Sequence, residues 1–193
     1  MSQLSEKIEA CDICAERFSK TKTAHSPRPV FWGSDTAPIL IAGQAPGARV
    51  HQSGKPFDDP SGDRLRSWLG VEKTVFYDRT HFAIVPMAFC FPGYSANGSD
   101  LPPPIVCSKT WHAKVIAAMP QVKLRILIGG YAFKFYLGRS GVTDTVRAWR
   151  DVTPGMIPLP HPSWRNTAWL KKNPWFENDV LPFLRARVTE VLT

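Results

Sequence analysis

Four short runs of apolar residues, each leading into a loop rich in glycine, proline or polar residues, constrain the fold most strongly. They are Ile39–Ala42, Phe82–Phe89, Leu124–Ile128 and Met156–Leu159. Runs of this length that alternate with helical segments are typical of a parallel sheet covered on both faces. The sequence therefore predicts an α/β fold: a three-layer α/β/α sandwich around a central four-stranded, mainly parallel sheet.

Helical spacing of apolar residues predicts the segments between and after these strands. We expect a short helix around Glu6–Arg17 that is interrupted or followed by the C-x2-C pair of Cys11 and Cys14. Further helices are expected from Ser61 onward with Ser61 as N-cap, and over Lys109–Met119, Tyr131–Leu137 and Phe176–Leu192. A chain of 193 residues is long enough to bury one core. We therefore expect residues 1–193 to form a single domain.

The chain is strongly basic, with a formal net charge of +8. A surface of this charge favours a polyanion such as nucleic acid as partner, although many basic proteins bind none. No apolar stretch is long enough to span a membrane, and the N-terminus lacks the apolar core of a secretory signal. We expect a cytoplasmic monomer with no membrane contact.

Two loops follow predicted strands and carry groups suited to ligand binding. Gly43–Gly47 offers backbone amides with little side-chain obstruction, and His161-Pro162-Ser163 places an imidazole directly after a strand. The carboxyl ends of parallel strands meet at one crevice, so the two loops predict one site. A turn without a ligand and a loop histidine with a structural hydrogen bond are the alternatives.

The segment Ser53–Gly62 places an aromatic ring and two carboxylates among glycines and prolines. Phe57 could stack on a planar ligand while Asp58 or Asp59 orients water or stabilises positive charge. Alternatively, Phe57 anchors the loop to the core and the carboxylates cap the next helix.

Aromatic and basic residues interleave after His161. This pattern suits a nucleic-acid surface, where cations meet phosphates and rings meet bases. A solvated loop anchored by its tryptophans is the alternative. The residues concerned are Trp164, Arg165, Asn166, Trp169, Lys171, Lys172 and Trp175.

The four cysteines are Cys11, Cys14, Cys90 and Cys107. The first two form a C-x2-C pair, a spacing that lets two thiolates bind one metal or cluster. A [4Fe–4S] cluster and a four-thiolate zinc ion both fit the count, and unrelated buried thiols are the third alternative.

Taken together, these motifs resemble the uracil-DNA glycosylase superfamily. Gly43-Gln44-Ala45-Pro46-Gly47 is similar to the first motif of its iron–sulfur families, and Gly54–Asp63 to the segment that carries their stacking ring. The cysteine layout also matches those families, which implies a [4Fe–4S] cluster. His161-Pro162-Ser163 is similar to the final motif, and its continuation Trp164-Arg165-Asn166 resembles that of single-strand-selective members.

The resemblance implies a repair enzyme that flips uracil out of DNA and hydrolyses its N-glycosidic bond. In such an enzyme His161 and Asp59 or Asp58 would be catalytic. The residues that would meet the base are Gln44, Ala45, Phe57 and Ser163, and those that would bind DNA are Trp164, Arg165, Asn166 and Lys171.

Two positions depart from the pattern. Ala45 replaces a water-activating Asp of the best-studied family, and Pro86 stands where the iron–sulfur families place an Asn that helps to specify uracil. A non-catalytic DNA-binding member of the same fold is therefore an alternative. A small-molecule nucleotide or nucleoside hydrolase on an α/β sheet is a second, separate alternative.

Overall fold

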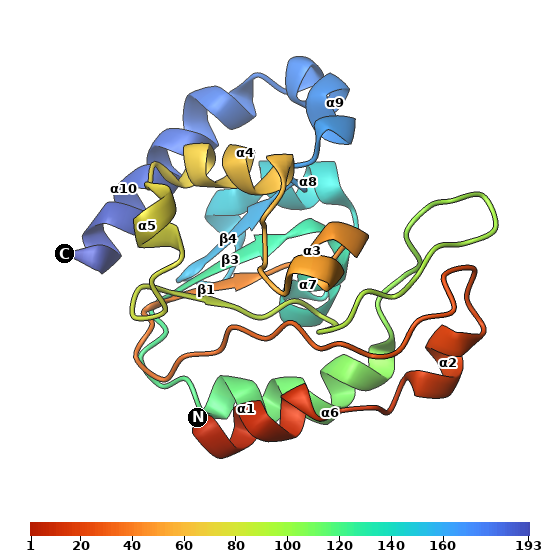
Figure 1. Ribbon diagram of the computed structural model, residues 1–193. Coiled ribbons are helices and arrows are strands. Elements are labelled where there is room, and N and C mark those ends of the chain that lie inside the picture. Colours follow the sequence, from red (N-terminus) through yellow and green to blue (C-terminus); the bar gives the residue numbers. More distant parts are fainter.

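The computed structural model describes all 193 residues and contains a four-stranded parallel sheet (Figure 1). The strand order is β2-β1-β3-β4. This arrangement confirms the α/β sandwich predicted from the sequence. The strands are β1 (Ile39–Ala42), β2 (Phe82–Ile84), β3 (Leu124–Ile128) and β4 (Met156–Leu159).

The second strand is shorter than the predicted run Phe82–Phe89. Val85 still donates to the Ile41 carbonyl at 2.9 Å. Pro86 has no N–H to continue the ladder, so regular pairing ends there. The chain then follows the loop after β1, since Met87 donates to the Gly43 carbonyl at 2.8 Å.

Helices cover both faces of the sheet. Helices α1 (Ser2–Glu9) and α6 (Ile105–Ala117) lie against one face, and α4 (Pro60–Leu69) and α10 (Leu181–Leu192) against the other (Figure 1). Successive side chains of β1 point to opposite faces of the sheet, so they pack against the two helical layers in turn. Leu40 packs with residues of α1 and α6, whereas its two neighbours in β1 pack in the larger cluster with α4 and α10.

Shorter elements complete the chain. They are α2 (Ala15–Ser19), α3 (Ala48–Ser53), α5 (Lys73–Phe76), α7 (Gly129–Leu137), α8 (Val142–Arg147), η1 (Trp149–Asp151), η2 (Trp164–Asn166), α9 (Thr167–Lys172) and η3 (Phe176–Val180). No helix combines the length and apolar character needed to cross a membrane.

Three helix predictions can be compared with the structure. The Glu6–Arg17 helix is interrupted at the C-x2-C pair, as expected, because the chain turns there between α1 and α2. Asp59 rather than Ser61 caps α4, with its carboxylate 3.0 Å from the Gly62 N–H and a proline in the first helical turn. The terminal helix begins with the π-helical turn η3 before α10.

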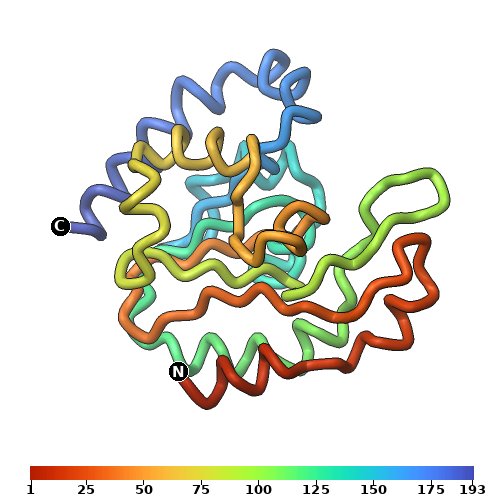
Figure 2. Tube along the Cα trace, in the orientation of Figure 1, coloured from red at the N-terminus to blue at the C-terminus, as the bar shows by residue number.

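The segment Phe91–Pro104 projects from the body beside the stretch that follows α2 (Figure 2). The imidazole Nε2 of His25 lies 2.9 Å from the Phe91 carbonyl. A side chain on Gly93 would meet Thr21 at 2.8 Å, and Gly93 has φ of +90°. Only glycine allows this close approach of the two segments.

Buried His112 makes folding sensitive to acid. Its Nε2 lies 3.0 Å from the Pro86 carbonyl, which can only accept, and burial lowers the pKa of His112. The unfolded chain therefore binds a proton more readily than the folded one. The contribution of His112 to stability is complete above about pH 6.5, the ordinary pKa of histidine, and is lost as the pH falls below it.

We expect His112→Phe to lower the free energy of unfolding by about 1 kcal/mol at high pH, through loss of one hydrogen bond. The cost should shrink in mild acid, because the variant no longer has to keep a buried imidazole unprotonated. Urea denaturation on either side of the ordinary histidine pKa measures this, and an equal cost at both pH values would contradict the assignment.

Candidate active site

A cavity of about 470 Å³ opens at the carboxyl ends of the strands. Its walls come from the loop after β1, the segment before α4, the chain after β2 and the loop after β4. Ligand sites of open parallel sheets lie in this position, and the volume is in the range of small-molecule sites. The two loops selected from the sequence therefore meet in one cavity.

His161 is the imidazole of this cavity, and the backbone determines its tautomer. The Ser163 N–H lies 3.2 Å from Nδ1. An N–H can only donate, so Nδ1 is the acceptor and the proton of the neutral ring is on Nε2. Burial lowers the pKa of His161, although Asp59 and Asp100 act in the opposite direction. His161 is thus a neutral N–H donor at neutral pH.

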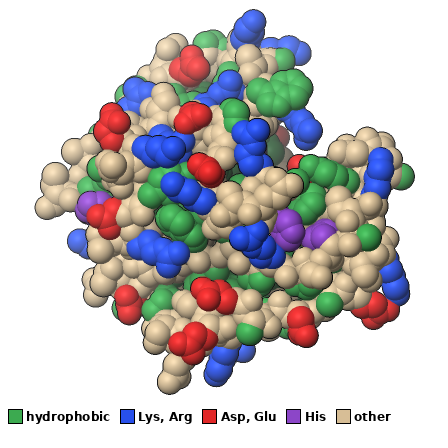
Figure 3. Space-filling model, viewed as in Figure 1, with side chains coloured by type: hydrophobic (Ala, Val, Ile, Leu, Met, Phe, Trp, Pro, Cys, Tyr) green, Lys and Arg blue, Asp and Glu red, His purple; other side chains and the backbone are tan.

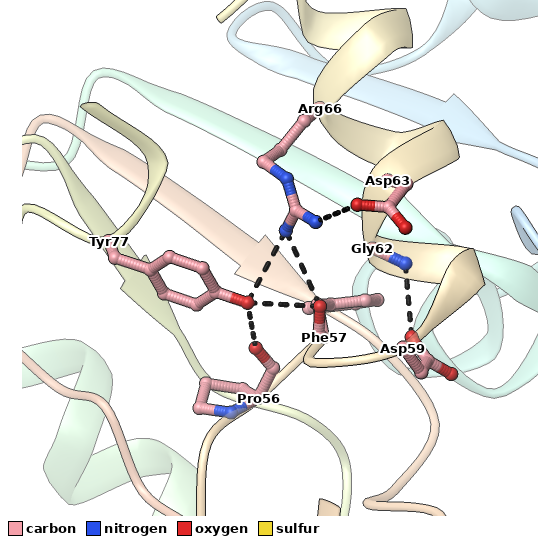
Figure 4. Close-up of polar contacts among 7 residues, drawn as sticks. All are labelled: Pro56, Phe57, Asp59, Gly62, Asp63, Arg66 and Tyr77. Carbon is pink, nitrogen blue, oxygen red and sulfur yellow. Dashed lines mark hydrogen bonds and ion pairs between the residues drawn. The ribbon is translucent and has the colours of Figure 1, made fainter. Parts of the chain in front are cut away.

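The two candidate carboxylates occupy different environments. Asp59 lines the cavity, and its side chain is held at the N-terminus of α4 by the Gly62 N–H (Figure 4). Asp58 is half-buried but is not part of the cavity wall. The sequence presents a cap for the next helix and a ligand-facing carboxylate as alternatives. Asp59 is both, because it caps α4 and also lines the cavity.

Phe57 lines the cavity in an unusual backbone conformation. Its φ is +55°, in the left-handed region that costs a bulky residue about 1–2 kcal/mol. The ring packs edge-on against Phe76, with centroids 6.1 Å apart. It also approaches Gly43, where an added Cβ would lie 3.9 Å from the ring. The ring is thus supported beside the loop that follows β1.

The Gly43–Gly47 loop is held by the chain after β2. Met87 and Ala88 donate backbone hydrogen bonds to the carbonyls of Gly43 and Gln44, at 2.8 and 3.1 Å. Gln44 and Ala45 are half-buried and line the cavity. The Gln44 side chain is the only amide side chain in the cavity wall.

The loop after His161 divides into exposed and anchored side chains. Trp164 is 74% exposed at the cavity, and Arg165 lines the cavity beside it. Asn166 turns inward instead and donates to the His161 carbonyl at 2.7 Å. Lys171 is exposed on α9 and lies outside the cavity wall. DNA contact by these residues stays a prediction.

Three charged residues of the site carry no local signal in the sequence. Asp100 and Arg49 line the cavity, and Arg64 of α4 donates to the Ser163 carbonyl at 2.9 Å. Asp100 comes from the Pro/Gly-rich loop, where nothing marks one polar residue over another. On the face shown in Figure 3, Lys and Arg side chains are spread among acidic ones rather than gathered in one patch.

The four cysteines lie together around a second, smaller cavity. Cys11 and Cys14 come from the turn between α1 and α2, Cys90 follows β2, and Cys107 lies in α6. All four are free thiols. Burial raises the pKa values of Cys90 and Cys107 to about 12.

Backbone donors act on two of these sulfurs, and a residue of the cavity wall has an unpartnered donor. The Phe89 N–H lies 3.4 Å from the Cys107 sulfur, and a backbone hydrogen bond from Arg28 acts on Cys90. Trp111 lines the cavity, and its buried indole N–H has no partner. Donors of this kind suit thiolates or inorganic sulfide. No three His, Cys, Asp or Glu side chains, however, are arranged to hold a metal ion.

Fold and site together define an α/β protein with an N–H donor, an aromatic ring and a carboxylate in one cavity at the strand ends. The chain belongs to the uracil DNA glycosylase superfamily, whose sequence profile matches residues 30–185. The resemblance seen in the motifs is therefore confirmed at the level of the superfamily.

A solved structure supports the fold. A solution NMR structure from Methanosarcina acetivorans, of a protein provisionally described as a uracil DNA glycosylase, superposes with a TM-score of 0.51 at 12% identity. The match covers 84% of this chain and 96% of the other. At this identity the likeness establishes the architecture alone.

The tautomer and titration of His161 can be measured directly. We expect ¹⁵N NMR to show a neutral Nε2–H ring whose pKa is below about 6.5. Asp100→Asn should lower that pKa further, because the carboxylate favours the protonated ring. Asp151→Asn, in η1, is the control and should leave it unchanged. An Nδ1–H tautomer would contradict the assignment.

Proposed function

We propose that this protein is a DNA glycosylase that excises uracil, together with other deaminated bases, and leaves an abasic site. The observation that carries the proposal is the neutral His161 N–H donor in a cavity shared with Phe57 and Asp59. Membership of the uracil DNA glycosylase superfamily supports action on DNA.

The chemistry follows from where charge develops. As the N-glycosidic bond breaks, the base gains negative charge and the sugar gains positive charge. His161, oriented by the Ser163 N–H, would donate from Nε2 to the carbonyl oxygen that becomes negative, as an oxyanion-hole donor does. The Asp59 carboxylate would stabilise the sugar cation or orient the attacking water.

The base must leave the helical stack to reach these groups. Phe57 would stack on its face, while the Gln44 side chain and the backbone of Gln44 and Ala45 meet its polar edge. Exposed Trp164 would occupy the space that the base vacates, and Arg165 would contact phosphates.

The cavity wall favours more than one base. Pro86 lines the cavity and offers no side-chain donor, so Gln44 alone supplies a side-chain amide. An amide can present either a donor or an acceptor, which makes it less selective than a pair of fixed groups. Uracil, hypoxanthine and xanthine share an adjacent N–H and carbonyl, and they form the proposed substrate class.

Single substitutions test the chemistry. His161→Ala should cost about 2–4 kcal/mol of transition-state stabilisation. That loss corresponds to roughly a 30- to 900-fold slower single-turnover excision of uracil. Asp59→Asn should also slow excision, whereas Asp58→Asn, the matched neighbour outside the cavity, should have the smaller effect. Equal effects of the two Asp substitutions would contradict the placement of Asp59.

A panel of uracil, hypoxanthine and xanthine in single- and double-stranded DNA should accompany these variants. DNA binding without release of any base would support a non-catalytic member of the fold instead. Cleavage of free nucleosides without salt-dependent DNA binding would indicate a small-molecule hydrolase.

We propose that Cys11, Cys14, Cys90 and Cys107 hold a [4Fe–4S] cluster. All four line one cavity, and the Phe89 N–H donates to the Cys107 sulfur. Trp111, whose buried N–H has no partner, also lines this cavity. A zinc ion needs four sulfurs about 2.3 Å from one point, whereas a cluster distributes its ligands over several irons. The cluster would act structurally, linking the N-terminal helices to the chain after β2.

Protein purified without oxygen should be brown and contain about four iron atoms per chain. Cys107→Ser should lose iron and visible absorbance and unfold at a lower temperature. Trp111→Phe, which keeps an apolar ring but not the N–H, should retain iron. Stoichiometric zinc, or a colourless protein of unchanged stability, would contradict the cluster.

A further inference from the structure

The carbonyl of Phe57 is the focus of a polar network outside the cavity (Figure 4). The Tyr77 hydroxyl lies 3.0 Å from this oxygen, and Arg66 Nη1 lies 3.4 Å from it. Neither Arg66 nor Tyr77 lines the cavity. Both therefore act on the peptide that carries the ring rather than on a ligand.

Arg66 is held by several partners at once. Its side chain is on α4, and only 7% of the residue is exposed. One end of the guanidinium contacts the Asp63 carboxylate at 2.6 Å, and Nη1 lies 3.3 Å from the Tyr77 hydroxyl. A buried guanidinium is costly unless its donors are used, so the Phe57 carbonyl and the Tyr77 hydroxyl are necessary partners.

Tyr77 completes a directed chain of hydrogen bonds. Its hydroxyl accepts from Arg66 and has one proton to donate, which the Phe57 and Pro56 carbonyls share at 3.0 and 3.1 Å. Burial raises the pKa of Tyr77, so the hydroxyl keeps that proton. The Lys55 ammonium lies over the ring, 4.0 Å from its centroid.

Gly62 allows the Phe57 carbonyl to sit against the first turn of α4. A Cβ on Gly62 would lie 1.8 Å from that oxygen, a distance that no side chain tolerates. The Gly62 N–H meanwhile holds the Asp59 carboxylate. The same turn thus determines the positions of both the ring and the carboxylate.

We propose that Arg66 and Tyr77 are positioning residues that hold Phe57 in its left-handed backbone conformation, so that its ring forms a fixed stacking platform in the cavity. The network compensates for the strain at φ of +55°. We call Arg66, Tyr77 and the hydrogen bonds that they make to the Phe57 carbonyl the clamp. The existence of the clamp does not depend on the proposed function, but its effect on base excision rests on that function.

The backbone conformation is tested first, without any substrate. In NMR spectra, a strong intraresidue contact between the amide and α protons of Phe57 marks positive φ. Tyr77→Phe and Arg66→Lys should each weaken this contact. Tyr136→Phe is the matched control, because the buried Tyr136 hydroxyl has no hydrogen-bond partner, and it should leave the contact unchanged.

The consequence for catalysis is tested by a double-mutant cycle in single turnover. Tyr77→Phe should slow excision about 10-fold in the otherwise wild-type protein, because small displacements of positioning groups are costly. In a Phe57→Ala background, Tyr77→Phe should slow excision less than about twofold, because Tyr77 acts on excision only through the Phe57 ring. DNA affinity should not change.

Each outcome decides the proposal. If Phe57 keeps its positive φ in both Tyr77→Phe and Arg66→Lys, the proposed clamp is wrong. Loss of positive φ with equal slowing in the Phe57→Ala background, or with no slowing at all, overturns the positioning role. A wild-type protein that excises no base disproves the proposed function instead, and the NMR result alone then decides the clamp.

Discussion

Parallel pairing of β1 with both β2 and β3 is the constraint on which the rest of the structure depends. Because all four strands run the same way, the loops after β1 and β4 emerge at one edge of the sheet although they are far apart in the sequence. The cavity exists because these loops meet there. The end of β2 before Pro86 adds a third wall, since the chain leaves the ladder and pairs with the Gly43–Gly47 loop instead.

The first turn of α4 organises the chemistry of a further part of the cavity wall. Asp59 satisfies a helix N–H and presents its carboxylate to the cavity, so a structural requirement of the helix also places a candidate reactive group. Gly62 lets the strained Phe57 peptide approach the helix, and Arg66 holds the carbonyl of that peptide. Ring and carboxylate therefore share one support, and the His161 donor reaches the same cavity from the loop after β4.

Sequence patterns with a local physical cause predicted the structure well. The runs at β1, β3 and β4 have the predicted bounds, because short buried strands between turns leave few other arrangements. The prediction at Ser61 was wrong by two residues, because a proline in the first helical turn favours Asp59 as the cap. Asp100, Arg64 and Arg66 could not be found, since each matters through a contact with a distant residue or with the cavity.

By itself the sequence determined the sheet, the two loops that meet at its edge and the superfamily whose motifs they match, because apolar periodicity and turn residues act locally. Only the tertiary structure decided which groups lie together. It placed Asp59 rather than Asp58 in the cavity wall, determined the tautomer of His161 and gathered four cysteines around one cavity. These outcomes depend on burial and on the hydrogen bonds that form only when the chain is packed.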